Sequence, residues 1–248
     1  MMKLILLRHG ESQWNLENRF TGWHDVDLTK KGIEEAEFSA KEIIKNNLQI
    51  NSVYTSLLKR AIKTTKIVSN IIGFPENNIN YEWRLNERHY GDLQGLNKSE
   101  TAAKFGENQV KIWRRSYDIA PPLIKQNDKR HPKFNKKFNN IESTLLPRGE
   151  SLKEVIERLI PFWEQYFETI KNNKGVHLIV AHSNSLRAIV KILDKLNEKE
   201  IVSLNIPTGV PLVYYFDSSF NIFKKEYLIE NSELEKKQSI VKNQGKIQ

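Results

Sequence analysis

Apolar and polar residues alternate along this chain with two different spacings. Residues 4–7 and 177–181 are short, almost wholly apolar runs, which are typical of parallel strands buried on both faces. Other stretches carry apolar residues at helical spacing. These amphipathic stretches begin at Thr29, after Ser56, at Glu150 and after His182. Strands that alternate with helices predict an α/β fold with a mostly parallel central sheet and helices on both faces.

Three segments depart from this alternation. Residues 83–122 carry dense charge and aromatic side chains, which indicates an inserted, lid-like helical segment. With the basic stretch that follows, the insertion spans about 83–140. Residues 212–216 and 223–229 flank a polar turn and predict a late hairpin. The chain is polar from residue 230, and we expect a mobile tail over about 230–248 of a single domain that spans 1–248.

Composition excludes several classes of protein. The chain has 248 residues, of which 39% are hydrophobic, and can bury a hydrophobic core without cross-links such as disulfide bonds. It has no cysteine, which excludes a disulfide framework and thiolate chemistry. The apolar start ends at Arg8, too early for a signal peptide, and no stretch reaches the roughly 18 apolar residues of a membrane span. We therefore expect a cytoplasmic protein without a membrane partner.

The formal net charge of +9 raises the question of a polyanionic partner. Residues 123–140 hold six bases against one acid, but their polar, Asn-rich character indicates a solvated loop. Aromatic side chains interleave with bases near Trp113, so a nucleic-acid-binding module is one alternative. Surplus positive charge serves a small anionic substrate equally well.

Both apolar runs end in a histidine, His9 in the first and His182 in the second. Ligands of open parallel sheets bind beyond the carboxyl ends of the strands, so neighbouring strands would bring both imidazoles into one crevice. Arg8 precedes His9, and Gly10 follows it. We expect Gly10 to allow backbone N–H groups to approach an anion closely.

Other residues near these strand ends favour a phosphate. Asn184 and Ser185 stand at a predicted helix start, where free N–H groups attract anions, and Arg187 follows a turn later. Arg60, on the helix after Ser56, is a candidate bidentate ligand. Phosphoryl transfer requires positioning and charge neutralisation of this kind. Nucleic-acid binding does not require two strand-end imidazoles, and no acidic cluster indicates a metal, so we expect neither partner.

Longer motifs in a fixed order make a family resemblance specific. Residues 7–15 read LRHGESQWN, residues 83–91 read WRLNERHYG, and residues 113–118 read WRRSYD. FTGW at 20–23, LQGLNKSET at 93–101 and NIPTGVPLVY at 205–214 agree with them. The sequence resembles the histidine phosphatase superfamily and is similar, more narrowly, to the cofactor-dependent phosphoglycerate mutases. The resemblance runs from residue 3 to about residue 228.

This resemblance implies roles for matching residues. His9 would carry the phosphoryl group on nitrogen, His182 would assist as a second imidazole, and Glu87 would be the general acid and base. The implied catalytic residues are His9, Glu87, His182, Arg8 and Arg60. The implied substrate-binding residues are Arg8, Asn15, Thr21, Gly22, Arg60, Glu87, Tyr90, Lys98, Arg114, Arg115, Ser183 and Asn184. His89 ranks below Glu87 as a base, and a surface partner for Arg84 or Arg88 is the other interpretation of Glu87.

The implied activity is an intramolecular phosphoryl transfer in glycolysis and gluconeogenesis. It interconverts 3-phosphoglycerate and 2-phosphoglycerate through a phosphohistidine that 2,3-bisphosphoglycerate primes, without a metal. Attack by water would instead give a phosphatase, and a basic lid that excludes water favours the mutase. A related phosphatase or a bisphosphoglycerate-forming enzyme is the alternative. Members of the family are monomers, dimers or tetramers, and we prefer a homodimer.

Two residues depart from the family pattern. Ser183 stands where the family usually has glycine. If this position needs a positive φ, serine costs about 1 kcal/mol or more, and Ser183→Gly should keep or raise activity. Arg148 lies near Glu150, next to which a hydroxyl residue is common. The sequence does not decide whether Arg148 reaches the site.

Overall fold

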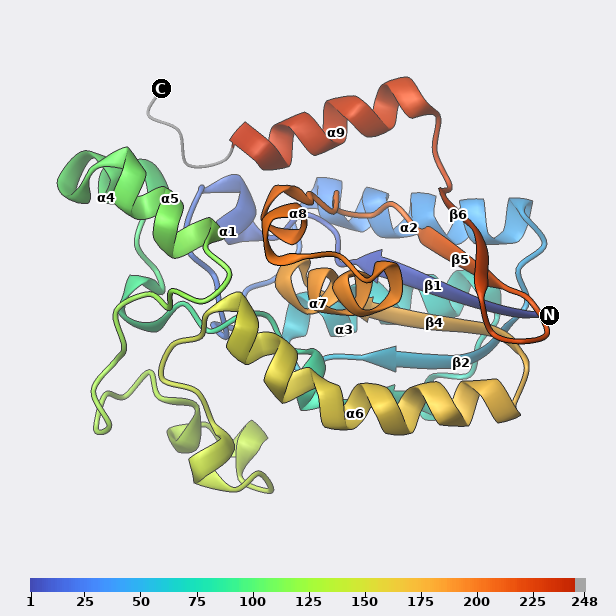
Figure 1. The fold of residues 1–248 in the computed structure, drawn as a ribbon, viewed down its shortest axis with the longest axis horizontal. Coiled ribbons are helices and arrows are strands. Elements are labelled where there is room, and N and C mark those ends of the chain that lie inside the picture. The colour runs from blue at the N-terminus through green and yellow to red at the C-terminus, as the bar shows by residue number, and fades with distance from the viewer. Residues whose placement is uncertain (244–248) are drawn as a thin grey trace.

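A single six-stranded sheet forms the centre of the molecule in the computed structural model, which describes residues 1–243 (Figure 1). Its order is β3-β2-β4-β1-β5-β6. The strands are β1 (Met2–Arg8), β2 (Ile50–Thr55), β3 (Ile79–Tyr81), β4 (Gly175–Ala181), β5 (Leu212–Phe216) and β6 (Ile222–Tyr227). The first four run parallel, whereas β5 pairs antiparallel with β1 and with β6. The predicted fold class is confirmed, and the late hairpin forms as predicted. The short β3 was not predicted.

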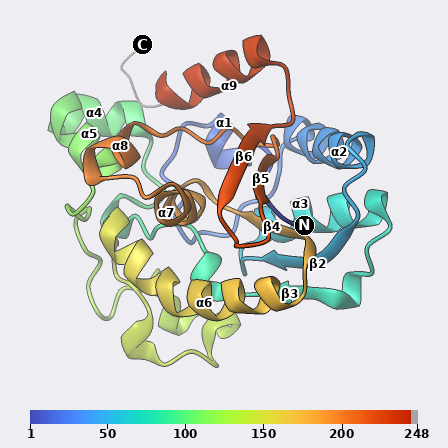
Figure 2. The same cartoon turned by 45° about the vertical axis from the view of Figure 1, so that its right-hand side comes forward.

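Helices cover both faces of this sheet (Figure 2). On one face, α2 (Lys30–Lys45) and α3 (Lys59–Ile72) share an apolar cluster with β1 and β4. On the other, α6 (Leu152–Asn172) and α7 (Ser183–Asp194) form the larger cluster. The other helices are α1 (Gln13–Leu16), α4 (Lys98–Phe105), α5 (Glu107–Arg115), α8 (Glu198–Ser203) and α9 (Asn231–Asn243).

Local sequence fixes where the helices begin. Thr29 Oγ1 accepts the N–H of Gly32 at 3.0 Å and caps α2. Ser151 and Glu154 form a reciprocal capping box at the start of α6. Helix α7 begins directly after His182, the residue that follows β4. The imidazole is therefore held between a buried strand and a helix without an intervening loop.

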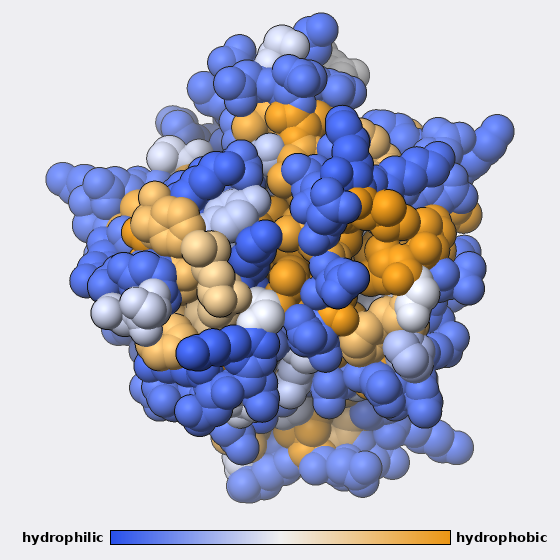
Figure 3. Space-filling model, turned by 90° about the vertical axis from the view of Figure 1, so that its right-hand side faces the viewer, coloured by the Kyte–Doolittle hydropathy of each residue, from blue (hydrophilic) through white to orange (hydrophobic). Residues whose placement is uncertain are grey.

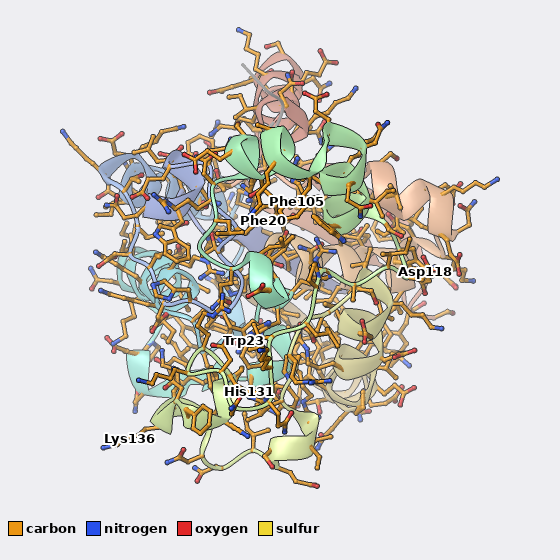
Figure 4. All side chains as sticks on the ribbon, turned by 90° about the vertical axis from the view of Figure 1, so that its left-hand side faces the viewer. Phe20, Trp23, Phe105, Asp118, His131 and Lys136 are labelled. Carbon is orange, nitrogen blue, oxygen red and sulfur yellow. The ribbon has the colours of Figure 1, made fainter. Side chains whose placement is uncertain are left out.

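The carboxyl ends of β1, β2 and β4 point to one end of the molecule, on the left in Figure 1, and α4 and α5 lie at the same end. Figure 4 faces this end and labels Phe20 near α4 and α5, with Trp23 and His131 farther below. Phe20 and Trp23 belong to two separate small apolar clusters. The segment between β3 and α6 thus packs against the loop after β1 over the strand ends.

The basic stretch 123–140 is more ordered than a solvated loop, so that expectation is wrong in part. It contains short 3-10 turns at Pro132–Phe134 and Lys136–Phe138. Phe138 is buried against Trp23, and His131 is 2% exposed. Apolar anchors that stand singly among polar residues leave no periodic pattern, which is why the sequence did not reveal this packing.

The polar end of the chain also forms structure. Residues 231–243 make up α9, which crosses above the sheet towards α4 and α5 (Figure 1). Lys237 pairs with Glu35 of α2, and Val241 is buried. The last part of the expected tail, 244–248, lies outside the described residues, and the expected mobility stays a prediction.

The opposite end of the molecule shows apolar residues in patches that polar residues separate (Figure 3). On the edge strand β6, exposed Phe223 is followed by Lys224 and Lys225. Charged residues of this kind oppose edge-to-edge pairing of sheets. No helix within residues 1–243 combines the length and hydropathy needed to cross a membrane.

Candidate active site

A basic cavity lies where three strands of the sheet end. Arg8 and His9 come from the end of β1, Arg60 from the first turn of α3 after β2, and Asn184 from the first turn of α7 after β4. The lining residues are Arg8, His9, Asn15, Arg19, Thr21, Gly22, Arg60, Glu87, Tyr90, Lys98, Arg114, Arg115, Ser183, Asn184, Arg187 and Val241. The structure thus brings together all the residues expected to bind substrate.

Two contacts hold the His9 ring and fix its tautomer. His9 Nδ1 lies 2.7 Å from the carbonyl oxygen of Gly10, which only accepts, so this nitrogen carries the hydrogen. Arg60 Nε donates to His9 Nε2 at 3.2 Å, so Nε2 is unprotonated and its lone pair faces the cavity side where Arg60 lies. Burial, and then the guanidinium groups of Arg60 and Arg8, lower the pKa of His9 well below 6.5. The ring is a neutral nucleophile at neutral pH.

His182 lies behind His9 rather than on the cavity wall. The two ring centroids are 4.9 Å apart, and His182 is fully buried. Ser56 Oγ accepts the N–H of Leu58 and lies 2.7 Å from His182 Nε2. The other ring nitrogen, Nδ1, is buried and has no hydrogen-bond partner among the described residues. When protonated, this nitrogen beside His9 suits an oxygen of an anion bound there.

Backbone carbonyls, rather than carboxylates, hold the two buried arginines next to His9. Arg8 Nη1 donates to the carbonyl of Ile206, and Arg60 donates to those of Gly22 and His24. A carbonyl fixes the guanidinium without neutralising its charge. Both arginines are at most 4% exposed. Their positive charge is therefore available to a ligand.

The electrostatic balance of the cavity calls for an anion. The described residues that line it include seven bases, Arg8, Arg19, Arg60, Lys98, Arg114, Arg115 and Arg187, against the single carboxylate of Glu87. Burial, followed by repulsion from Arg114, lowers the pKa of Lys98 well below 10.5. Burial and the neighbouring Arg115 lower the pKa of Arg114 to about 10. A bound anion would relieve this repulsion.

The Glu87 carboxyl is held at one oxygen. Its Oε1 accepts the backbone N–H of Arg88 at 2.8 Å and both the backbone N–H and Nδ2 of Asn184, at 3.0 and 2.9 Å. The interpretation of Glu87 as a surface partner is wrong, because Arg84 pairs with Glu82 and the Arg88 side chain donates to the carbonyl of Arg114. Glu87 itself is 7% exposed.

His89 is not a candidate base in this structure. It is fully buried outside the cavity lining, and its Nδ1 accepts the N–H of Gly91 at 3.0 Å. Burial lowers its pKa to about 3. Arg148 also lies outside the lining, where its carbonyl accepts the N–H of Ile124. Both residues support the loops around the cavity.

A buried ion pair supports the segment that carries Glu87. Arg158 of α6 and Glu150 are 2.6 Å apart and at most 6% exposed. Arg158 also donates to the carbonyls of Arg84 and Asn86, and Glu150 accepts the N–H of His89. This support was not predictable from the sequence, because it joins residues about 70 positions apart.

Arg187, which the sequence placed near the strand ends, lies in the lining one helical turn after Asn184. Two further residues of the lining were not predicted. Arg19 precedes the turn at residues 22–23, and its Nη1 donates to the carbonyl of Gly95. Val241 of α9 gives no chemical signal in the sequence.

One expectation about the backbone is wrong, and the condition set for another is not met. Gly10 N–H donates to Thr64 Oγ1 at 3.1 Å rather than toward an anion. A Cβ at Gly10 would lie 2.0 Å from the carbonyl oxygen of Gly32, so glycine is needed for packing against the start of α2. Ser183 does not have a positive φ, so the strain considered for this position is absent.

Comparison with known proteins identifies the class first. Residues 4–222 match the Histidine phosphatase superfamily (branch 1), and the chain belongs to this superfamily. A mycobacterial glucosyl-3-phosphoglycerate phosphatase of known structure shares the fold, with a TM-score of 0.69 at 22% identity over 92% of this chain and 97% of that chain.

More similar relatives narrow the assignment. Proteins named 2,3-bisphosphoglycerate-dependent phosphoglycerate mutase are 50% identical in Bacteroides fragilis, over 247 residues, and 49% identical in Treponema denticola, over 245 residues. Each alignment covers 99% of both chains. The superfamily and the narrower resemblance to cofactor-dependent phosphoglycerate mutases, both predicted from the sequence, are confirmed.

Proposed function

We propose that this enzyme interconverts 3-phosphoglycerate and 2-phosphoglycerate by passing a phosphoryl group through His9. This is the reaction that the name of the relatives denotes and the one predicted from the sequence. The neutral Nε2 of His9 carries the proposal, because it stands as a nucleophile in a cavity with seven bases and the carboxylate of Glu87 among its described lining residues.

The residues of the cavity fit 2,3-bisphosphoglycerate, the primer that the relatives' name indicates. Arg8 and Arg60 would hold one phosphate next to His9. Lys98 and Arg114 would face the carboxylate and the other phosphate. In support, Arg8 Nε is buried without a hydrogen-bond partner among the described residues, and Lys98 and Arg114 repel each other until an anion binds. When bound, the primer supplies the phosphoryl group that loads His9.

Glu87 carries the proton in both half-reactions. In the first, ionised Glu87 takes the proton from the free hydroxyl of 3-phosphoglycerate as that oxygen attacks the phosphorus on His9 and the bond from phosphorus to Nε2 breaks. In the second, His9 Nε2 attacks the other phosphate of the resulting bisphosphate, the bond from that phosphorus to the glycerate oxygen breaks, and protonated Glu87 gives its proton to that oxygen. Arg8 and the Nδ1–H of His182 would donate to the phosphoryl oxygens throughout.

A phosphatase is the competing function, since water can attack the same phosphohistidine. The mutase requires the bisphosphate to turn within the cavity without escaping and without water entering. The described cover of the cavity supports the mutase. Val241 of α9 lines the cavity, and Arg115 donates to its carbonyl at 3.5 Å, so α5 and α9 meet above the site.

Product analysis separates the two functions. Primed enzyme supplied with 3-phosphoglycerate should form 2-phosphoglycerate as its main product, whereas release of mainly inorganic phosphate would contradict the mutase.

His9→Gln should lower kcat by about 10⁴-fold or more, because the nucleophile is lost. His177→Gln is the matched control. His177 is also a buried histidine, but it bonds to Ser52 away from the cavity, and this change should largely preserve activity. Equal losses in both variants would show that His9 has no special role.

Several finer points are part of the proposal. The enzyme is a single cytoplasmic domain with an insertion at about 83–140, and it acts as a homodimer on a small anionic substrate. It requires no metal and binds no nucleic acid. In residues 1–243, no three His, Cys, Asp or Glu side chains are grouped to hold a metal ion. Activity in EDTA, sedimentation equilibrium and a gel shift at physiological salt test these points.

A further inference from the structure

Arg187 is a buried cation of the cavity wall whose role neither the sequence motifs nor the proposed mechanism explains. It follows Asn184 by one turn of α7, so the two side chains share a helix face. Only 2% of Arg187 is exposed. Its Nη1 donates to Asn184 Oδ1 at 3.0 Å, and its Nη2 donates to the carbonyl of Ile201 in α8 at 2.5 Å. Two fixed partners therefore hold the guanidinium in place.

This guanidinium determines how the Asn184 amide is turned. Arginine has donors and no acceptor, so the amide oxygen must face Arg187. The NH₂ group then faces Glu87, where Nδ2 donates to Oε1 at 2.9 Å. The reversed amide has almost the same shape, but it would set donor against donor at Arg187 and oxygen against carboxylate at Glu87.

The chosen orientation makes the two oxygens of Glu87 unequal. Oε1 accepts three hydrogen bonds, from Arg88 N–H, Asn184 N–H and Asn184 Nδ2. Within residues 1–243, no hydrogen bond to Oε2 is formed. An oxygen that already accepts three donors binds a proton weakly, so the proton belongs on Oε2.

We propose that Arg187 is a positioning residue for Glu87. By fixing the Asn184 amide, it leaves Oε2 of Glu87 free to bind the proton that passes to and from the glycerate oxygens. This inference rests on the proposed function, in which Glu87 is the general acid and base. Arg187 acts through Asn184 and needs no contact with the substrate.

Two substitutions of Arg187 test this role. Arg187→Met removes both donors, and we expect kcat to fall about 10- to 100-fold with little change in KM. The acidic limb of the kcat profile should move to higher pH, because the carboxylate loses a donor that favours its ionised form. Arg187→Lys retains a donor for Asn184 and should recover most of kcat. Equal kcat and pH profile in parent and Arg187→Met would overturn the proposal.

A double-mutant cycle shows whether Arg187 acts through Asn184. If it does, Asn184→Ala/Arg187→Met should be no slower than Asn184→Ala alone. Losses that multiply, together with a KM that rises in Arg187→Met, would mean that Arg187 binds the substrate directly. That result would overturn the proposal.

Asn184→Asp keeps the test decisive if Arg187→Met does not fold. Aspartate is nearly isosteric and still accepts from Arg187, but it sets an oxygen against Glu87 in place of the NH₂ group. The acidic limb of the pH profile of kcat should again move to higher pH, and an unchanged pH profile would refute the inference. Failure of the proposed function is distinct, because the parent enzyme would then form no phosphohistidine or would release only inorganic phosphate.

Discussion

Groups that can only donate or only accept hydrogen bonds orient the side chains around His9. The carbonyl of Gly10 only accepts and the guanidinium of Arg60 only donates, so the proton of the His9 ring is fixed on Nδ1. Arg187 orients Asn184 by the same logic. Substitutions that preserve the size of a side chain but replace a hydrogen-bond donor with an acceptor, or the reverse, should therefore affect the rate more than the free energy of unfolding.

Ser183→Gly removes a hydroxymethyl group from the cavity lining. Ser183 is the first residue of α7 and does not have a positive φ, so glycine relieves no strain there. We expect activity to stay close to that of the parent and the free energy of unfolding to fall by about 0.5 kcal/mol, because glycine is a poorer helix former. Urea unfolding and initial rates measure both. A strong loss of activity with unchanged stability would show that the hydroxyl contacts the substrate.

Residues that carry chemistry were predictable where they stand in long motifs. His9 and Arg60 come together as expected, because strand ends and the following helix starts meet at one edge of a parallel sheet. Glu87 comes from the loop after the 3-10 helix Trp83–Leu85, and only the family resemblance predicted it. Arg187 was not predictable as a positioning residue. Its role depends on the direction of one amide, which no spacing in the sequence encodes.

At the scale of elements, two glycines let the loop after β1 pack against α2. A Cβ at Gly10 would meet the carbonyl oxygen of Gly32, and a Cβ at Gly32 would meet that of Glu11, each at 2.0 Å. The contact fixes the position of the Gly10 carbonyl, which accepts from His9. The packing of one helix thus determines the orientation of the nucleophile.

Gly10→Ala should separate these elements. The added methyl group meets backbone atoms that cannot rotate away, so we expect the free energy of unfolding to fall by about 3 kcal/mol or more and kcat to fall with it. Gly73→Ala is the control, because Gly73 has a φ of 74° but nothing within 4 Å of an added Cβ. It should cost about 1 kcal/mol and leave kcat unchanged. Unchanged kcat in stable Gly10→Ala would contradict this account.

Regular elements were predictable from apolar periodicity, whereas the cover of the site was not. The strands and helices of the central layers follow alternation and capping residues such as Thr29 and Ser151. The packing of residues 123–140 depends on isolated anchors such as Phe138. Helix α9 is polar along most of its length, so its position over the cavity depends on tertiary contacts rather than on a local pattern.

At the scale of the whole molecule, buried neutral histidines link stability to pH. Burial lowers the pKa of His177 to about 4 and that of His89 to about 3, and it lowers those of His9 and His182 well below 6.5. Below pH 6.5 the unfolded chain binds protons at these residues that the folded chain does not bind. Stability is therefore full above pH 6.5 and is lost as the pH falls toward the folded-state values.

Urea unfolding between pH 6.5 and pH 5 should detect this loss. His177→Gln removes one of these histidines, so its free energy of unfolding should fall by about 1.5 kcal/mol less than that of the parent over this range. His24→Gln, at an exposed position, should stay closer to the parent. Identical slopes for the parent and His177→Gln would refute the linkage.

In the proposed mechanism, His9 holds the phosphoryl group covalently between successive turnovers. Incubation with isotopically labelled 2,3-bisphosphoglycerate, followed by mass spectrometry under conditions that preserve acid-labile phosphate, detects this group. We expect one labelled phosphate on His9, which unlabelled phosphate replaces when unlabelled 3-phosphoglycerate is added. An enzyme that turns over while no phosphate is found on His9, or with the phosphate on another residue, would contradict it.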